Sequence, residues 1–160
     1  MNKKDLLQPD KKPHPDPITI LLADDDIEDR QFTIDALEES HVLNQLFTVE
    51  NGEELLDFLY KKGKYKAMPR PGLIILDLNM PKTDGREALK IIKTDGDLRQ
   101  IPVVVLTTSQ AEEDIYKSYD LGVSSFITKP VTFERLVKVM KALGKYWFEI
   151  VELPPNGYNK

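Results

Sequence analysis

Residues 18–26 read ITILLADDD, an apolar run that stops at three consecutive aspartates. Three further apolar runs also stop at a polar side chain: GLIIL (72–76) before Asp77, IPVVVL (101–106) before Thr107, and VSSFIT (123–128) before Lys129. Short runs with β-branched residues, separated by helical patterns, indicate buried strands of a parallel sheet. Such strands present their carboxyl ends at one edge, where ligands bind. We therefore expect these acids, the hydroxyl and the ammonium to converge, a set suited to a divalent cation and a phosphoryl group.

Five strand patterns alternate with five helical patterns, and no internal repeat is visible. Right-handed crossovers then predict an α/β fold, a doubly wound parallel sheet with helices on both faces. Residues 1–17, which contain four of the 11 prolines, are expected to be a flexible tail. The expected strands are 18–23, 46–50, 73–77, 103–106 and 123–128, and the expected helices are about 27–39, 52–62, 86–94, 111–121 and a last one after residue 132.

Local signals support several of these helices. Asn51 with Glu54 and Ser109 with Glu112 have capping-box spacing, and Thr132 can cap the last helix. Gly63 is expected to end the second helix, which should bury Leu55, Leu56 and Leu59 with Phe58 alongside. Two inward stripes fit the first helix: Ile27, Ile34 and Leu37, or Phe32 and Ala36.

Composition excludes several classes of protein. The chain has no cysteine, so thiolate metal sites, cysteine nucleophiles and disulfides are excluded. The net charge of −5, with no basic stripe, argues against nucleic-acid binding. No apolar run approaches the roughly 18 residues of a membrane span, and the N-terminus lacks an apolar signal region. A cytoplasmic protein is the expectation.

Each polar strand end also has an ordinary explanation. The run Asp24-Asp25-Asp26 could simply cap a helix, Thr107 could finish a strand as a β-branched residue, and Lys129 could be a surface lysine. Asp77 is different, because an unpaired carboxylate at the end of a doubly buried strand is costly. Like charges on one edge raise each other's pKa, and a hard cation such as Mg²⁺ relieves that cost.

The segments ITILLADDD, LIILDLNMPKTDG, VVVLTT and FITKP resemble the receiver domain of two-component response regulators. The resemblance covers about residues 18–145 and implies the flavodoxin-like receiver fold with strand order 2-1-3-4-5, in a domain spanning 18–148 with a C-terminal tail at 149–160. The segments KYKAMPRP, DLNMPKTDGRE, VVVLTTS and KYWFEIVELP resemble those of small single-domain regulators that partner phytochrome histidine kinases.

The resemblance also implies roles for individual residues. Asp77 would accept a phosphoryl group from a kinase phosphohistidine, and Mg²⁺ would be held by Asp25 directly, Asp24 mainly through water, Asp77, and the backbone carbonyl of Asn79. Thr107 would hydrogen-bond a phosphoryl oxygen, and Lys129 would form an ion pair with that group. Phe126 occupies the position of the family's aromatic switch residue, for which plain core packing is the alternative. Thr108 and Val131 depart from the commonest pattern, which bears on phosphoryl lifetime and switch geometry.

Two other functions compete with a phosphoacceptor. A haloacid-dehalogenase-like phosphatase also uses a strand-end aspartate with Mg²⁺, but it needs an acid two residues later, where this chain has Asn79. A pseudo-receiver would lack required side chains, and all of them are present. We therefore expect a protein switch that is not an enzyme, with only self-catalysed phosphorylation and dephosphorylation.

The end of the sequence suggests where a signal leaves. We expect no output domain after the last helix, so the output is expected to be another protein or self-association. Tyr146, Trp147 and Phe148 form an aromatic cluster that can mark an interface or pack on the body of the domain. Regulators of the resembled type are expected to dimerise through the face of the fourth helix, fifth strand and fifth helix, and we predict a homodimer through that face.

Overall fold

The computed structural model describes residues 19–41, 45–78, 80, 85–107, 125–129 and 131–145, with the side chains of 125, 126, 144 and 145 outside the description. Five parallel strands form one sheet in the order β2-β1-β3-β4-β5, which confirms the predicted fold. The strands are β1 (Thr19–Ala23), β2 (Gln45–Val49), β3 (Leu73–Asp77), β4 (Val103–Thr107) and β5 (Ser125–Thr128). The helices are α2 (Ile27–Ser40), α3 (Gly52–Leu59), α4 (Gly85–Thr94) and α6 (Phe133–Lys145), with 3-10 turns η2 (Gly63–Tyr65) and η3 (Leu98–Gln100).

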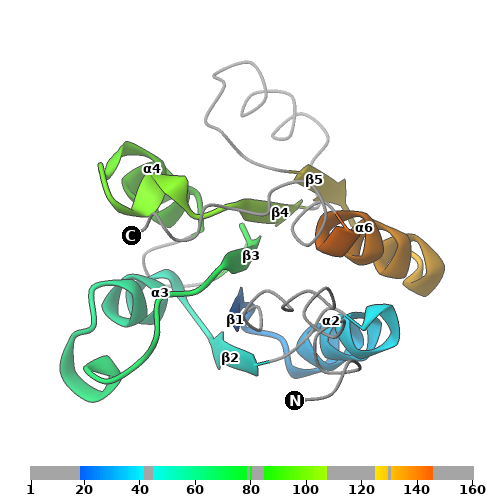
Figure 1. Cartoon of the computed structure of the whole chain (residues 1–160), viewed down its shortest axis with the longest axis horizontal. Helices are drawn as coiled ribbons and strands as arrows, with labels where there is room; N and C mark the ends of the chain where they lie inside the picture. The colour runs from blue at the N-terminus through cyan, green and yellow to red at the C-terminus, as the bar shows by residue number, and fades with distance from the viewer. Residues whose placement is uncertain are drawn as a thin grey trace, which may run out of the picture.

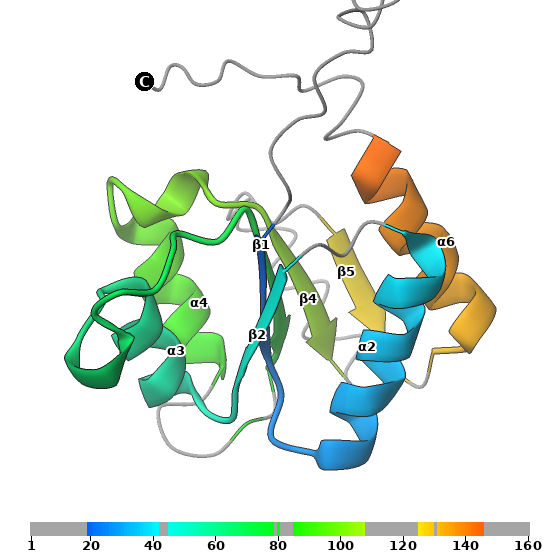
Figure 2. The ribbon, with the colours of Figure 1, turned by 60° about the horizontal axis from the view of Figure 1, so that its bottom comes forward.

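The sheet lies between two pairs of helices, α3 with α4 on one face and α2 with α6 on the other (Figures 1 and 2). Alternate residues of the central strands divide between two cores: Leu21 and Ile74 pack toward α3 and α4, whereas Leu22 and Ile75 pack toward α2 and α6. All residues of β3 and β4 are buried, as expected for strands covered on both faces.

Side-chain caps start the helices at the predicted places. Asn51 Oδ1 accepts the N–H of Glu54 at 2.8 Å, and the Glu54 carboxylate accepts the N–H of Glu50 at 2.9 Å. Thr132 Oγ1 accepts the N–H of Arg135 at 3.1 Å, which fixes the start of α6. The expected helix at about 111–121, with its Ser109–Glu112 cap, lies outside the described residues.

Two sequence expectations for the helices were wrong. Helix α3 ends at Leu59 rather than near Gly63, because Lys61 adopts a left-handed conformation (φ 56°). The N–H groups of Lys61 and Lys62 then bond back to the carbonyls of Phe58 and Asp57, a Schellman arrangement that closes the helix. Ile27 does not face inward but is 70% exposed, whereas Ala36 and Leu37 are buried.

No helix in the described part of the chain is both long enough and apolar enough to cross a membrane. The proposed domain limits at 18 and 148 and both expected tails fall outside the described residues.

Candidate functional site

Three carboxylates meet at the carboxyl edge of the sheet. Strands β1 and β3 are neighbours, with Ala23 paired to Leu76, so Asp24 directly after β1 lies beside Asp77 at the end of β3. One carboxylate oxygen from each of Asp24, Asp25 and Asp77 lies within 4.8 Å of the others. The strand order reverses between these two strands, and this is the position at which sheets of this type bind ligands.

Asp24 is fully buried and lies close to other charged groups. Its Oδ1 accepts the N–H of Asp26 at 3.0 Å, while its buried Oδ2 has no hydrogen-bond partner among the described residues. Burial raises the pKa of Asp24 from 3.8 to about 6; the Asp26 N–H opposes this, Asp77 adds to it, and Lys129 partly offsets it. A buried carboxylate oxygen without a donor, facing two further carboxylates, fits a hard divalent cation.

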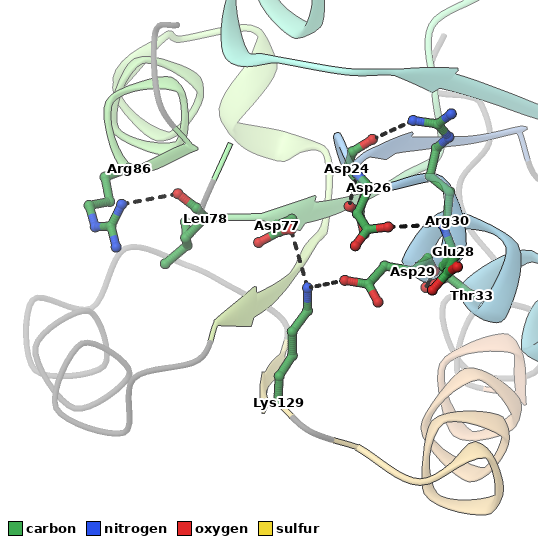
Figure 3. A network of polar contacts seen from close by, with 10 residues as sticks. All are labelled: Asp24, Asp26, Glu28, Asp29, Arg30, Thr33, Asp77, Leu78, Arg86 and Lys129. Carbon is green, nitrogen blue, oxygen red and sulfur yellow. Dashed lines mark hydrogen bonds and ion pairs between the residues drawn. The ribbon is translucent and has the colours of Figure 1, made fainter. Parts of the chain in front are cut away.

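Lys129 lies between two acids from different elements (Figure 3). Its Nζ is 3.2 Å from Oδ2 of Asp77 and 3.2 Å from Oδ2 of Asp29. Burial lowers the pKa of Lys129, but Asp77 and Asp24 outweigh that effect, so its pKa is raised and it remains an ammonium group. The Lys129 N–H also donates to the carbonyl of Thr107 at 2.7 Å, which ties the turn after β5 to the end of β4.

Thr107 is the last residue of β4 and is fully buried. It pairs in register with Thr128 of β5, and the neighbouring Leu106 carbonyl accepts the N–H of Leu78 at 3.0 Å. The end of β4 is thereby held against the residue that follows Asp77. This places Thr107 on the same edge of the sheet as the three carboxylates.

Several predicted site residues fall wholly or partly outside the described part of the chain. Asn79, Tyr146, Trp147 and Phe148 lie outside the described residues, and of Phe126 only the backbone in β5 is described. Their expected roles stay predictions.

The structure adds two residues of α2 that the sequence pattern does not predict at the site. Asp29 contacts Lys129, and Arg30 Nη1 donates to the carbonyl of Asp24 at 2.9 Å. Both lie in the first turn of a helix that starts just after the acidic run. The sequence does predict that the first turn of this helix lies beside the carboxyl edge of β1, since the helix begins just after that strand. It does not predict which of its side chains point toward the site, because that depends on the rotation of the helix about its axis.

Comparisons with known proteins agree with this geometry. Residues 20–141 match the family described as response regulator receiver domain. The chain is 42% identical over 138 residues to response regulator Rcp1 of Synechocystis sp., covering 86% of this chain and 94% of Rcp1. It is also similar to the crystal structure of the phosphorylated cyanobacterial phytochrome response regulator RcpA, with 42% identity, a TM-score of 0.73, and coverage of 86% and 98%. The Mn²⁺-bound form of Rcp1 matches with the same identity and TM-score over 86% of this chain and 99% of that one.

Proposed function

The chain belongs to the family of response regulator receiver domains, and from this premise we propose that Asp77 accepts a phosphoryl group from the phosphohistidine of a sensor histidine kinase. The observation that carries the proposal is the position of Asp77. It lies within 4.8 Å of two further acids and 3.2 Å from the ammonium group of Lys129. Proteins of this family act in two-component signalling, and phosphorylated RcpA supports the same chemistry here.

Asp24, Asp25 and Asp77, with the backbone carbonyl of Asn79, would hold Mg²⁺. The unpartnered, buried Oδ2 of Asp24 and the Mn²⁺-bound form of the relative Rcp1 support a divalent cation at this position. When bound, the cation supplies positive charge that offsets the charge of the transferring phosphoryl group.

The side chains of this chain would then act as follows. A carboxylate oxygen of Asp77 forms the new O–P bond as the N–P bond of the phosphohistidine breaks, and the histidine nitrogen leaves with that electron pair. Lys129 neutralises charge on the phosphoryl oxygens, and the Thr107 hydroxyl donates a hydrogen bond to one of them. Because Asn79 cannot protonate a leaving group, we expect a phosphoacceptor with slow self-catalysed turnover rather than a phosphatase.

The output is proposed to be a change in protein contacts. The phosphoryl group on Asp77 would carry about −1.5 to −2 of charge in place of the single negative charge of the carboxylate, and it would draw Thr107 toward it and let Phe126 move inward. We also propose a homodimer. Its interface would be the face formed by the expected helix at about 111–121, β5 and α6, with Tyr146, Trp147 and Phe148 nearby. The cytoplasmic location, the lack of nucleic-acid binding and the domain limits 18–148 remain predictions from the sequence.

The central test is incubation with Mg²⁺ and labelled acetyl phosphate. We expect an acid-stable, base-labile label on the wild-type protein that is lost in Asp77→Asn. Absence of label in the folded wild type would contradict the proposal, and rapid turnover of a small phosphoester would favour the phosphatase. Equilibrium sedimentation with and without beryllofluoride, a mimic of the phosphoryl group, tests the homodimer. Transfer of a phosphoryl group from a phosphorylated phytochrome histidine kinase to this protein tests the upstream partner.

A further inference from the structure

Lys129 has a second acidic partner, Asp29, which does not belong to the three-carboxylate cluster. The Lys129 ammonium group lies 3.2 Å from both Asp29 and Asp77, so the two acids share one cation (Figure 3). We propose that Asp29 competes with the incoming phosphoryl group for Lys129 and thereby slows phosphorylation of Asp77. This inference rests on the proposed function of Asp77.

The backbone of Asp29 is held in place by the start of α2. Asp26 caps the helix by accepting the N–H of Glu28 at 2.9 Å, and the Asp29 carbonyl accepts the Thr33 hydroxyl at 3.1 Å. Farther along, Ala36 and Leu37 anchor the helix in the core shared with α6. As the third residue of the helix, Asp29 also lies where the helix dipole favours a negative charge.

The available cations explain why this pair forms. Arg30, the next residue, is directed elsewhere, to the carbonyl of Asp24 at 2.9 Å and to the carboxylate of Glu50 at 3.7 Å. Among the described residues, Lys129 is therefore the cation that contacts Asp29. The same ammonium group is the one that the phosphoryl group requires.

Asp77 and Asp29 differ in exposure. This difference determines which acid keeps Lys129 after phosphorylation and how much the phosphorylation rate should change when Asp29 is removed. The side chain of Asp77 is 4% exposed, whereas that of Asp29 is 48% exposed and its charge is screened by water. A phosphoryl group on Asp77 carries about −1.5 to −2 of charge and would therefore win Lys129 from Asp29. Because pairs of this exposure are weak, removing Asp29 should raise the phosphorylation rate only about two- to five-fold.

The test compares initial rates of phosphorylation by acetyl phosphate in Mg²⁺, over a range of donor concentrations. Asp29→Asn keeps the shape but removes the charge, and we expect the two- to five-fold increase. Asp29→Glu keeps the charge and should stay near the wild-type rate. The matched control is Asp35→Asn, which removes an exposed charge from the same helix, where Asp35 accepts a hydrogen bond from Gln31 at 2.9 Å; its rate should not change.

A second comparison shows whether Asp29 acts through Lys129. In a Lys129→Met background, Asp29→Asn should have no effect on the rate. A double-mutant cycle of Asp29→Asn and Lys129→Met can also be measured in metal-free protein by urea denaturation. The two substitutions should be coupled by about two- to five-fold in the unfolding equilibrium constant of the protein. This readout does not require phosphorylation.

The outcomes separate this inference from the proposed function. If wild type is phosphorylated on Asp77 but Asp29→Asn is unchanged or slower, the competition is overturned while the proposed function stands. An increase that persists without Lys129 also overturns it, because Asp29 would then act through general charge. If folded wild type takes no label, the proposed function fails and this inference fails with it.

Discussion

A Cβ atom placed on Gly85 would lie 2.6 Å from the backbone carbonyl oxygen of Asp77. It would also lie 2.6 Å from Cα of Leu78, so both obstacles are backbone atoms that cannot rotate away. Glycine therefore allows the start of α4 to pack directly against the end of β3. Arg86 strengthens this contact, because its Nη1 donates to the Leu78 carbonyl at 3.0 Å (Figure 3).

Replacing Gly85 with alanine should therefore disturb Asp77 through its backbone. We expect Gly85→Ala to lower the free energy of unfolding by about 1–3 kcal/mol, because the backbone must shift to admit the methyl group. Phosphorylation by acetyl phosphate should slow in the same variant. Gly96→Ala is the control, since a Cβ there meets nothing within 4 Å, and urea denaturation should show equal or slightly greater stability. A Gly85→Ala protein with wild-type stability and rate would show that the end of β3 adjusts freely.

The sequence pattern predicts a helix at about 86–94, which leaves Gly85 just outside it and gives that glycine no special role. The close approach to Asp77 could not be inferred, because it depends on how α4 docks against the sheet. The convergence of Asp24, Asp77, Thr107 and Lys129 could be predicted, since it follows from parallel strands ending at one edge. Such alignment depends on topology alone and not on the rotation of any helix.

Asp24 should destabilise the metal-free protein. Its pKa of about 6, raised from 3.8 first by burial, means that folding disfavours the ionised form. At pH 7.5 we expect Asp24→Asn to raise the free energy of unfolding without metal by about 1–3 kcal/mol. The same variant should lose most of the stabilisation that Mg²⁺ gives to wild type. Asp35→Asn, an exposed charge removal, should change stability by less than about 0.5 kcal/mol. Urea unfolding curves of wild type and Asp24→Asn, each measured with EDTA and with Mg²⁺, test both expectations. An Asp24→Asn protein that is less stable than wild type in EDTA would contradict the pKa argument.

The same pKa predicts opposite pH effects on folding and on metal binding. Between about pH 4 and 6 the folded metal-free state keeps a proton on Asp24 that the unfolded chain has released. The contribution of this group to stability therefore falls as pH rises through that window and is constant above it. Mg²⁺ needs the ionised form, so its dissociation constant should rise by up to about tenfold per pH unit below pH 6. Calorimetric titrations from pH 5 to 8 test this, and Asp24→Asn should remove much of the dependence.

Ile27 shows where sequence periodicity fails. The sequence pattern places Ile27 on one of two inward stripes, yet this residue is 70% exposed. Ile27 is the first residue of α2, while the buried contacts with the sheet come from Ala36 and Leu37, more than two turns farther along. The apolar residues of this helix are spread around its circumference, so the pattern alone does not choose one face. The contact between Asp29 and Lys129 depends on the same choice and was missed for the same reason.

Truncating these residues should have unequal effects. Ile27→Ala should change the free energy of unfolding by less than about 0.5 kcal/mol, because the side chain is mostly in water already. Leu37→Ala should cost about 2–5 kcal/mol, because it removes a fully buried side chain from the core shared with α6. Urea denaturation of both variants makes the comparison. Similar losses in the two would mean that α2 is rotated from the orientation described.

Arg30 is expected to hold the backbone that carries Asp24 and Asp25 through a hydrogen bond rather than through its ion pair with Glu50. Its guanidinium donates to the Asp24 carbonyl at 2.9 Å, and its distance to the Glu50 carboxylate is longer, 3.7 Å. The Arg30 side chain is 15% exposed and that of Glu50 is 63% exposed, so water screens the ion pair. We expect Arg30→Ala to cost about 1.5–3 kcal/mol of unfolding free energy, the range for a hydrogen bond from a charged group.

Arg30→Ala should also weaken Mg²⁺ binding several-fold, because the backbone that carries Asp24 and Asp25 loses its attachment to α2. Glu50→Gln separates the two contacts, since it removes the charge of Glu50 and leaves the bond to Asp24. Its cost should stay below about 0.5 kcal/mol, with Mg²⁺ affinity unchanged. The measurements are urea denaturation and calorimetric Mg²⁺ titration of both variants at one pH and salt concentration. Equal losses in Arg30→Ala and Glu50→Gln would assign the stabilisation to the ion pair and contradict the role given to the backbone contact.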